Sequence, residues 1–307
     1  MKIDSGQLAA FAAVLREGSF EAAARALHVT PSAVSQRVKG LEERLGRVLI
    51  RRGAPCIATE AGQSLQRHAQ QLQLLEAQAL APFGLADIST QRGRAAPAAG
   101  LPLALAVNAD SLATWFAPAL AALRAQHDAV FDLHVEDQDH SSVLLREGRV
   151  MAAVTADPHP VQGCRVLPLG RMRYLAVASP AFVARHFAGG IDADALAAAP
   201  CNVFNRKDEL QHRWMRRVVP GRRRLDPPCH RVPSTHGFIH ASLHGLGWGM
   251  NPDMLVAPLL EAGALVELVP GAVLDVPLYW QHWRLEVPVM QALTRSVHEA
   301  AAPLRGP

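Results

Sequence analysis

The chain has 307 residues, of which 50% are hydrophobic and 19% are charged, and its formal net charge is +4. These values fit an ordinary globular protein of two or three domains. No stretch of about 18 uninterrupted apolar residues occurs, which excludes a transmembrane helix, and the N-terminal MKIDSGQLAAF lacks the apolar core and cleavage site of a signal peptide. We therefore expect a cytoplasmic protein without a membrane partner.

Three helices are predicted in the first 45 residues. The first spans about residues 5–17, and the second opens at Ser19, an N-cap residue with Glu21 in the first turn. The third begins at Thr30-Pro31, because Thr is a good N-cap and Pro is favoured at the first helical position. Its apolar side chains recur at spacings of four, three and four, which predicts one buried face made of Val34, Val38, Leu41 and Leu45.

A two-stranded hairpin is predicted next, from residues 48–52 and 56–58 around a turn at 53–55. Thr59 then caps a long helix over about residues 60–81. Apolar residues along one seam of this helix favour pairing with a second helix. We therefore expect a dimer contact at Leu65, Leu72 and Leu75, with packing against the helix's own domain as the alternative.

The region after this helix changes character. Residues 82–100 are rich in Gly, Pro and Ala and are predicted to form a hinge. Strand–helix–strand units follow, which predicts mostly parallel sheets flanked by helices. The predicted strands cover residues 101–107, 130–135, 150–155, a segment from 174 to 178, and 278–283, and the predicted helices cover about 111–126 and 141–147.

The third helix carries a polar face opposite its apolar stripe. Short polar side chains near its N-terminus and a cation further along are typical of a helix that reads base edges and phosphates. Gln36 could make paired bonds to adenine, and the hairpin arginines are placed for phosphates. Residues 1–60 contain nine Lys or Arg and six Asp or Glu, and a merely solvated face is the alternative. The predicted DNA-binding residues are Thr30, Pro31, Ser32, Ser35, Gln36, Lys39, Arg51 and Arg52.

A family resemblance supports this interpretation. The segment SFEAAARALHVTPSAVSQRVKGLEERLG, followed by LIRR and TEAG, resembles the N-terminal domain of LysR-type transcriptional regulators, and the resemblance covers residues 5–85. It implies an α+β winged helix-turn-helix with a long linker helix, then a two-lobed, periplasmic-binding-protein-like (type 2) α/β effector domain. It also implies dimers or tetramers, dyad-symmetric promoter DNA and RNA polymerase as partners, no cofactor, and a place on the nucleoid.

On this basis the chain divides into four parts. Residues 1–59 form the DNA-binding domain, 60–84 the linker helix, 85–100 the hinge and 101–307 the effector domain. Within the effector domain, one lobe comprises about residues 101–172 and 276–307, and the other comprises about 173–275.

Three segments of the effector domain narrow the resemblance. They are LPLALAVNADSLATWFAPAL, VTADPHPVQGCRVLPLGRMRYLAVASPAF and PLYWQHW, and they resemble the ArgP/LysG subgroup of the same family. This resemblance implies control of basic amino acid export with lysine or arginine as the effector. A regulator for a neutral amino acid or another metabolite is the alternative.

An effector of a two-lobed sheet protein binds where its strands end. We expect the turn at residues 108–111 and the turn at 234–235 to face each other and hold an α-carboxylate on helix N-termini. A buried ammonium or guanidinium must be paired, so acids at strand ends are the candidate partners, Asp137 first among them. The predicted effector site comprises Asn108, Asp110, Ser111, Glu136, Asp137, Thr155, Asp157, Ser234 and Thr235.

Other functional classes find little support. The sequence contains no G-x-S-x-G elbow, P-loop, G-x-G-x-x-G or HExxH motif, so we predict no enzyme. His236, His240 and His244 share a helix face, but no nearby Cys or acid completes a zinc site. A solute-binding transport component would share the C-terminal fold but would carry a secretion signal and no wing.

The cysteines complete the sequence picture. Cys56, Cys164, Cys201 and Cys229 are far apart in the chain and form no CxxC pair. In a chain without a signal peptide we expect reduced thiols, and a redox-sensing pair is the alternative.

Overall fold

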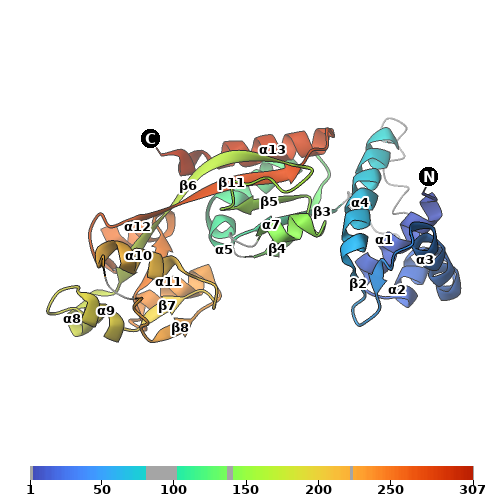
Figure 1. Cartoon of the computed structure of the whole chain (residues 1–307). Helices are drawn as coiled ribbons and strands as arrows, with labels where there is room; N and C mark the ends of the chain where they lie inside the picture. The colour runs from blue at the N-terminus through green and yellow to red at the C-terminus, as the bar shows by residue number, and fades with distance from the viewer. Residues whose placement is uncertain (1–2, 81–101, 137–140, 222–223, 307) are drawn as a thin grey trace.

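The computed structural model describes residues 3–80, 102–136, 141–221 and 224–306. Its N-terminal module, at the right of Figure 1, is a helical bundle with a short two-stranded wing and a long last helix. The structure confirms the predicted helices and hairpin of this module. The elements are α1 (Ser5–Glu17), α2 (Phe20–Ala26), α3 (Pro31–Leu45), β1 (Ile50–Arg51), β2 (Ile57–Ala58) and α4 (Glu60–Leu80).

Side-chain hydrogen bonds fix the wing against α3 and α4. Glu42 on α3 accepts from the backbone amides of Leu49 (2.8 Å) and Ile50 (3.2 Å). Thr59 donates to the carbonyl of Val48 (2.7 Å) and accepts from the amide of Gly62 (3.1 Å). The wing is therefore held at both of its ends by the helices that precede and follow it.

The effector domain is built on one large mixed sheet and a separate two-stranded sheet. Most strand pairs of the large sheet are antiparallel, so the prediction of mostly parallel sheets was wrong. The strand order of the large sheet is β10-β6-β11-β5-β3-β4, and β9 also pairs with β6. The first lobe contains the parallel strands β3 (Pro102–Val107), β4 (Val130–Val135) and β5 (Ala152–Thr155). The long antiparallel strands β6 (Cys164–Ala178) and β11 (Leu274–Trp283) run from this lobe toward the second (Figure 1).

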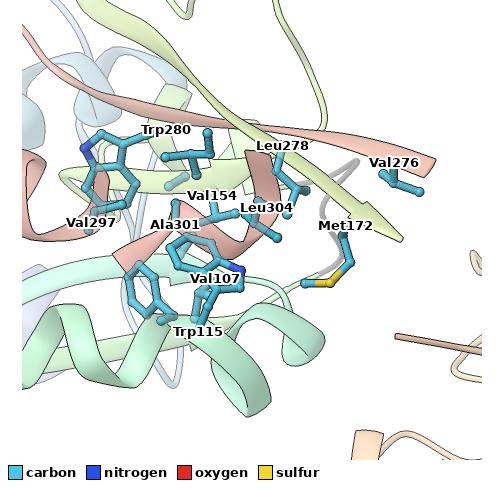
Figure 2. Packing of buried hydrophobic residues seen from close by; sticks show 14 of the residues in the cluster. Val107, Trp115, Val154, Met172, Val276, Leu278, Trp280, Val297, Ala301 and Leu304 are labelled. Atoms are coloured by element: carbon cyan, nitrogen blue, oxygen red, sulfur yellow. The ribbon is translucent and has the colours of Figure 1, made fainter. Parts of the chain in front are cut away.

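Helices cover the sheet of the first lobe. One continuous helix consists of α5 (Ala109–Ser111), a π-helical turn at Leu112–Phe116, and α6 (Ala117–Arg124). The others are α7 (Ser141–Arg146), α13 (Pro288–Ala300) and a final 3₁₀ turn at Ala302–Arg305. Between them and the sheet lie buried side chains from segments far apart in the chain, including Trp115, Val154, Trp280 and Val297 (Figure 2).

The second lobe, at the lower left of Figure 1, interrupts the first in sequence. Its strands β7 (Cys201–Val203) and β8 (Cys229–Arg231) pair in parallel, while β9 (Gly249–Pro252) and β10 (Val266–Glu267) join the large sheet. Its helices are α8 (Pro180–His186), α9 (Ala193–Ala198), α10 (Leu210–Val218), α11 (Thr235–Leu243) and α12 (Asp253–Glu261).

Two strands extend beyond their predicted bounds. The sequence predicted a strand from Tyr174, but β6 begins ten residues earlier, at Cys164, and β11 begins at Leu274 rather than Leu278. The early part of β6 alternates irregularly between buried and exposed positions and contains Pro168 and Gly170, so its pattern does not indicate a strand. Pairing with β11 nevertheless holds it extended.

The linker helix α4 packs against both parts of the chain. Leu65 and Ala69 lie in the core of the N-terminal module, whereas Leu74 lies in the core of the effector domain. The predicted hinge at residues 85–100 lies outside the described residues. Within the described ranges, no helix combines the length and apolarity needed to cross a membrane.

Candidate functional site

The polar face of α3 is open to solvent beside the wing. Thr30 caps the helix by accepting from the amide of Ala33 (3.2 Å). Thr30, Pro31, Ser32, Gln36 and Lys39 are exposed and Ser35 is half-buried, while the apolar face of the same helix is buried. The polar face of α3 is therefore open to a partner molecule, while its role in binding DNA stays a prediction.

The wing arginines extend this surface. Arg51 and Arg52 are both exposed. The Arg52 guanidinium lies 4.7 Å from the centre of the Phe20 ring and donates to the hydroxyl of Ser35 (3.4 Å). The wing and α3 therefore meet through Arg52, and the cations of the wing lie next to the polar face of the helix.

A pocket of about 140 Å³ lies between the two lobes of the effector domain. It is smaller than the roughly 300–1,000 Å³ of sites for drug-sized ligands, so it fits a small metabolite. Four of the predicted effector residues line it, namely Asn108, Asp110, Glu136 and Thr235. The structure thus brings the turn after β3 and the start of α11 together, 125 residues apart in sequence for Asp110 and Thr235.

Asp110 joins the lobes at this pocket. One of its carboxylate oxygens accepts from the Thr235 hydroxyl (2.8 Å) and the other accepts from the Tyr174 hydroxyl (2.8 Å). Thr235 begins α11 in the second lobe, and Tyr174 lies on β6, which passes between the lobes. A hydrogen bond to a carboxylate is stronger than one between neutral groups, so this contact favours the present spacing of the lobes.

A second link across the pocket involves charges. The Lys207 ammonium of the second lobe lies 3.7 Å from the Glu136 carboxylate at the end of β4. Both side chains are more than one-third exposed, so the pair contributes at most about 1 kcal/mol. It is an interaction that a ligand carrying its own cation could replace.

Of the charged residues that the second lobe contributes to the pocket, sequence reasoning found none. The segment after β7 contributes Lys207, Asp208 and Glu209, and α10 contributes Arg213. Asp208 accepts from the amides of Phe204 (2.8 Å) and Leu210 (3.0 Å), which shapes the turn before α10. The sequence feature that could have indicated Lys207, Asp208 and Glu209 is the charged run RKDE (residues 206–209), which is separated from the end of β7 by two residues.

Four further predicted effector residues, Ser111, Thr155, Asp157 and Ser234, are described by the structure and do not line the pocket. Ser111 and Thr155 are fully buried, and Ser234 caps α11 by accepting from the amide of Gly237. The Asp157 carboxylate accepts from the backbone amide of His159 (2.9 Å), which lowers the pKa of this carboxyl. Asp137 lies outside the described residues.

The predicted dimer residues on α4 differ in their surroundings. Leu65 is buried in the core of its own module, and Leu72 is half-buried against the same core. Leu75, in contrast, is 44% exposed. His236, His240 and His244 on α11 and its end are all exposed, and the described part of the chain holds no group of three potential metal ligands.

Comparisons with known proteins agree with this two-part architecture. Residues 5–63 match the bacterial regulatory helix-turn-helix protein, lysR family, and residues 100–302 match the LysR substrate binding domain. The HTH-type transcriptional regulator LysG of Mycobacterium tuberculosis is 50% identical over 303 residues, which cover 99% of this chain and 95% of the relative. The lysine export transcriptional regulatory protein LysG of Corynebacterium glutamicum is 42% identical over 299 residues, covering 96% and 97%.

Solved structures show the same similarity in three dimensions. The crystal structure of ArgP from Mycobacterium tuberculosis superposes with a TM-score of 0.85 at 48% identity, covering 99% of each chain. Full-length LysG from Corynebacterium glutamicum with bound effector Arg gives a TM-score of 0.78 at 39% identity, covering 99% of this chain and 100% of that one.

Proposed function

This chain belongs to the LysR family of bacterial transcriptional regulators, and we propose that it senses L-lysine or L-arginine and controls the gene of a basic amino acid exporter. The chain is a DNA-binding regulator and not an enzyme. The name of the Corynebacterium relative refers to lysine export, and a structure of that relative holds arginine. These relatives support a basic amino acid as the effector of this chain.

The charge of the interlobe pocket is the observation that carries the proposal. Its described lining contains four carboxylates, from Asp110, Glu136, Asp208 and Glu209, and two cations, from Lys207 and Arg213. A zwitterion with a cationic side chain brings two positive groups and one negative group, which suits this excess of acids. A buried cation needs such partners, because its desolvation is otherwise costly.

We orient the ligand by the two ends of the pocket. The α-ammonium group pairs with Asp110, and the α-carboxylate lies at the first turn of the helix that begins at Ala109, where backbone amides attract an anion. The distal cation lies at Glu136 and Asp137 and displaces Lys207. Thr235 holds the Asp110 carboxylate within the lining, and Ser111, Thr155, Asp157 and Ser234 support these contacts from outside it.

The DNA contacts and the assembly complete the proposal. The exposed face of α3, with Ser32, Ser35 and Gln36, reads bases, while Lys39, Arg51 and Arg52 bind phosphates.

The α4 helices of two copies pair at Leu75, beside Leu72 and Leu65, into a dimer, and dimers pair into tetramers. A regulator bound at promoters acts on RNA polymerase, so we place this protein on the nucleoid with RNA polymerase as a partner.

Isothermal titration of the reduced full chain tests the effector. We expect L-arginine or L-lysine to bind at least about a hundredfold more tightly than L-norleucine, since an unpaired carboxylate costs several kcal/mol and each 1.4 kcal/mol is tenfold. Glu136→Gln should weaken binding of the basic amino acid about tenfold. Glu286→Gln, an exposed acid outside the pocket lining, is the matched control.

Two results would contradict the proposal. One is heat from a neutral amino acid together with none from lysine and arginine at millimolar concentration. The other is unchanged binding of the basic amino acid in Glu136→Gln, which would remove the distal cation from this end of the pocket.

A further inference from the structure

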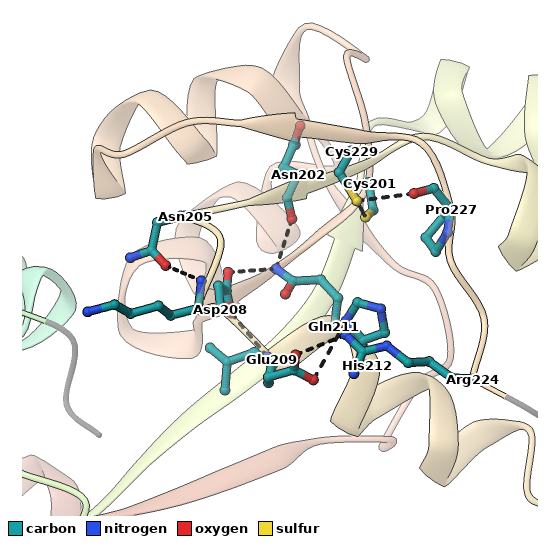
Figure 3. Close-up of polar contacts among 12 residues, drawn as sticks. Cys201, Asn202, Asn205, Asp208, Glu209, Gln211, His212, Arg224, Pro227 and Cys229 are labelled. Carbon is teal, nitrogen blue, oxygen red and sulfur yellow. Dashed lines mark hydrogen bonds and ion pairs between the residues drawn. The ribbon is translucent and has the colours of Figure 1, made fainter. Parts of the chain in front are cut away.

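Two cysteines that are 28 positions apart in sequence meet in the second lobe. The Sγ atoms of Cys201 on β7 and Cys229 on β8 lie 3.3 Å apart (Figure 3). The two residues are direct partners in the parallel pairing of these strands. Neighbouring strands lie about 4.7–4.9 Å apart, within the 4.4–6.8 Å range between Cα atoms that a disulfide spans. The backbone spacing of the two residues is therefore already compatible with a disulfide.

The two thiols differ in accessibility. Cys201 is 1% exposed, and burial together with the neighbouring thiol raises its pKa. Cys229 is half-buried and donates to the carbonyl of Pro227 (3.1 Å). A solvent-borne oxidant therefore reaches Cys229 first, and Cys201 lies behind it. The other two cysteines, Cys56 and Cys164, are both buried, and no sulfur–sulfur contact involving them is found among the described residues.

We propose that Cys201 and Cys229 form an oxidisable dithiol that closes to an intramolecular disulfide and alters the adjoining ligand pocket. With hydrogen peroxide as the oxidant, the Cys229 sulfur attacks one peroxide oxygen, the O–O bond breaks, and sulfenic acid and water result. The Cys201 sulfur then attacks the Cys229 sulfur, the S–OH bond breaks, and a second water leaves with the Cys201 proton. Both cysteines are oxidised by one electron each, and one peroxide is reduced to two waters.

The dithiol is connected to the pocket by a buried polar network, drawn in Figure 3. Asn202 is next to Cys201 in the chain, and its backbone carbonyl accepts a hydrogen bond from the side-chain amide of Gln211 (2.8 Å). Gln211 also donates to the Asp208 carboxylate (3.3 Å), which lines the pocket. Asn202 itself donates to the carbonyl of Gly247 (3.0 Å). Asn202 and Gln211 are fully buried, so this network has little freedom to absorb a displacement of β7.

Closing the disulfide turns the two side chains toward each other and fixes the spacing of β7 and β8. A disulfide bond is about 2.05 Å long, so the sulfurs approach by more than 1 Å from their contact distance. Because β7 leads into the pocket wall at residues 204–209 and β8 leads toward Thr235, a covalent bond between the two strands restricts how these parts of the wall adjust to a ligand. We expect the oxidised protein to bind its ligand at least about threefold more weakly. This second step rests on the proposed function, whereas the formation of the bond does not.

Mass spectrometry of the full chain tests the bond. The reduced protein is treated with hydrogen peroxide, quenched with catalase and alkylated under denaturing conditions. We expect wild type to lose two hydrogen atoms, to retain two of its four free thiols, and to recover all four with dithiothreitol. Cys56→Ser/Cys164→Ser should behave in the same way at its two remaining cysteines. Cys201→Ser should instead accumulate a sulfenic acid at Cys229 that dimedone traps.

Circular dichroism of reduced Cys201→Ser, Cys201→Ala and Cys229→Ser shows whether each variant is folded. Retention of all four thiols in peroxide-treated wild type, or a disulfide between two chains in non-reducing gels, would overturn the proposal.

Titration with L-arginine then compares oxidised and reduced wild type. Equal affinity of the two forms would disprove the coupling to the pocket but not the dithiol. A lack of binding by the reduced form would refute the effector assignment alone.

Discussion

Arg67 on the linker helix α4 donates a hydrogen bond of 2.6 Å to the backbone carbonyl of Arg146 at the end of α7. The same guanidinium donates to the carbonyls of Leu145 (3.1 Å) and Gln162 (2.9 Å). Gly148 lies against Arg67 so closely that a Cβ atom there would lie 3.1 Å from the Arg67 Cβ. One side chain thus ties the DNA-binding part of the chain to the first lobe.

This contact lies at the far end of α7 from the pocket. The helix begins at Ser141, five residues after the pocket residue Glu136, and its last two carbonyls, of Leu145 and Arg146, accept from Arg67. The C-terminal carbonyls of a helix lack intrahelical partners and carry partial negative charge, so a guanidinium is well suited to them. A change in the position of α7 would therefore reach the linker helix through Arg67.

We expect Arg67→Met to uncouple ligand binding from DNA binding. A typical coupling free energy is about 1–3 kcal/mol, so loss of this contact should reduce the effect of ligand on DNA affinity by about threefold or more. Ligand affinity itself should stay within twofold. Fluorescence anisotropy with and without L-arginine measures the effect, and Arg124→Met on α6 is the control. Full coupling in Arg67→Met would contradict this role.

The close packing of Gly62, at the junction of the wing and the linker helix, predicts that any side chain there lowers the stability of the N-terminal module. A Cβ atom at Gly62 would lie 2.1 Å from the carbonyl oxygen of Leu49, a backbone atom that cannot move aside. We expect Gly62→Ala to destabilise the N-terminal module by about 1–3 kcal/mol or more and to weaken DNA binding. Calorimetry measures the shift in Tm. Gly189→Ala, where the added Cβ meets no atom within 4 Å, should leave Tm nearly unchanged.

The N-terminal module was readily predicted from sequence because its signals are local. Ser19 and Thr30 were identified as N-caps, and each makes the expected side-chain bond to an amide three residues later. The Thr59-x-x-Gly62 spacing carried the family resemblance, and the structure explains it by the close approach of Gly62 to Leu49. Helix periodicity and capping depend on neighbours in the sequence, so one sequence is sufficient to find them.

The pocket was only half predicted because its contacts are not local. Strand-end reasoning found Asp110 and Thr235, which meet across 125 residues. It did not find Lys207, Asp208 or Arg213. The charged run at residues 206–209 marks the first two as candidates, but their place in the pocket depends on how the second lobe folds back on the first. The pairing of Cys201 with Cys229 is of the same kind, since it follows from the register of two short strands and not from spacing.

Self-association through α4 is best tested at Leu75. An aspartate at this exposed position should be tolerated in a monomer but would be buried and unpaired between two helices, at a cost of several kcal/mol. We expect Leu75→Asp to convert the dimer to a monomer in light scattering. The control is Gln66→Glu. Gln66 lies nine residues before Leu75, which is two and a half turns at 3.6 residues per turn, so it is on the opposite side of the helix. An unchanged mass in Leu75→Asp would exclude this contact.

The α3 surface should divide into residues that read sequence and residues that bind any DNA. The assay is anisotropy with a duplex selected by the protein from a random pool. Gln36→Ala should cost about 1–3 kcal/mol on that duplex and relax the preference at one base pair, because its amide can pair with adenine. Arg52→Ala should weaken selected and random duplexes alike and lower the slope of log K against log salt by about one.

Arg52 needs a further measurement because it also contacts Phe20 and Ser35. Loss of these contacts would destabilise the module itself, so the Tm of Arg52→Ala is compared with that of wild type. Arg51→Ala removes the other exposed wing arginine and is a second test of phosphate binding by the wing. Arg305→Ala, near the C-terminus on the effector domain, should leave DNA affinity unchanged. If Ser35→Ala/Gln36→Ala binds the selected duplex as tightly as wild type, α3 does not read the bases through these side chains, and the sequence preference must come from elsewhere in the module.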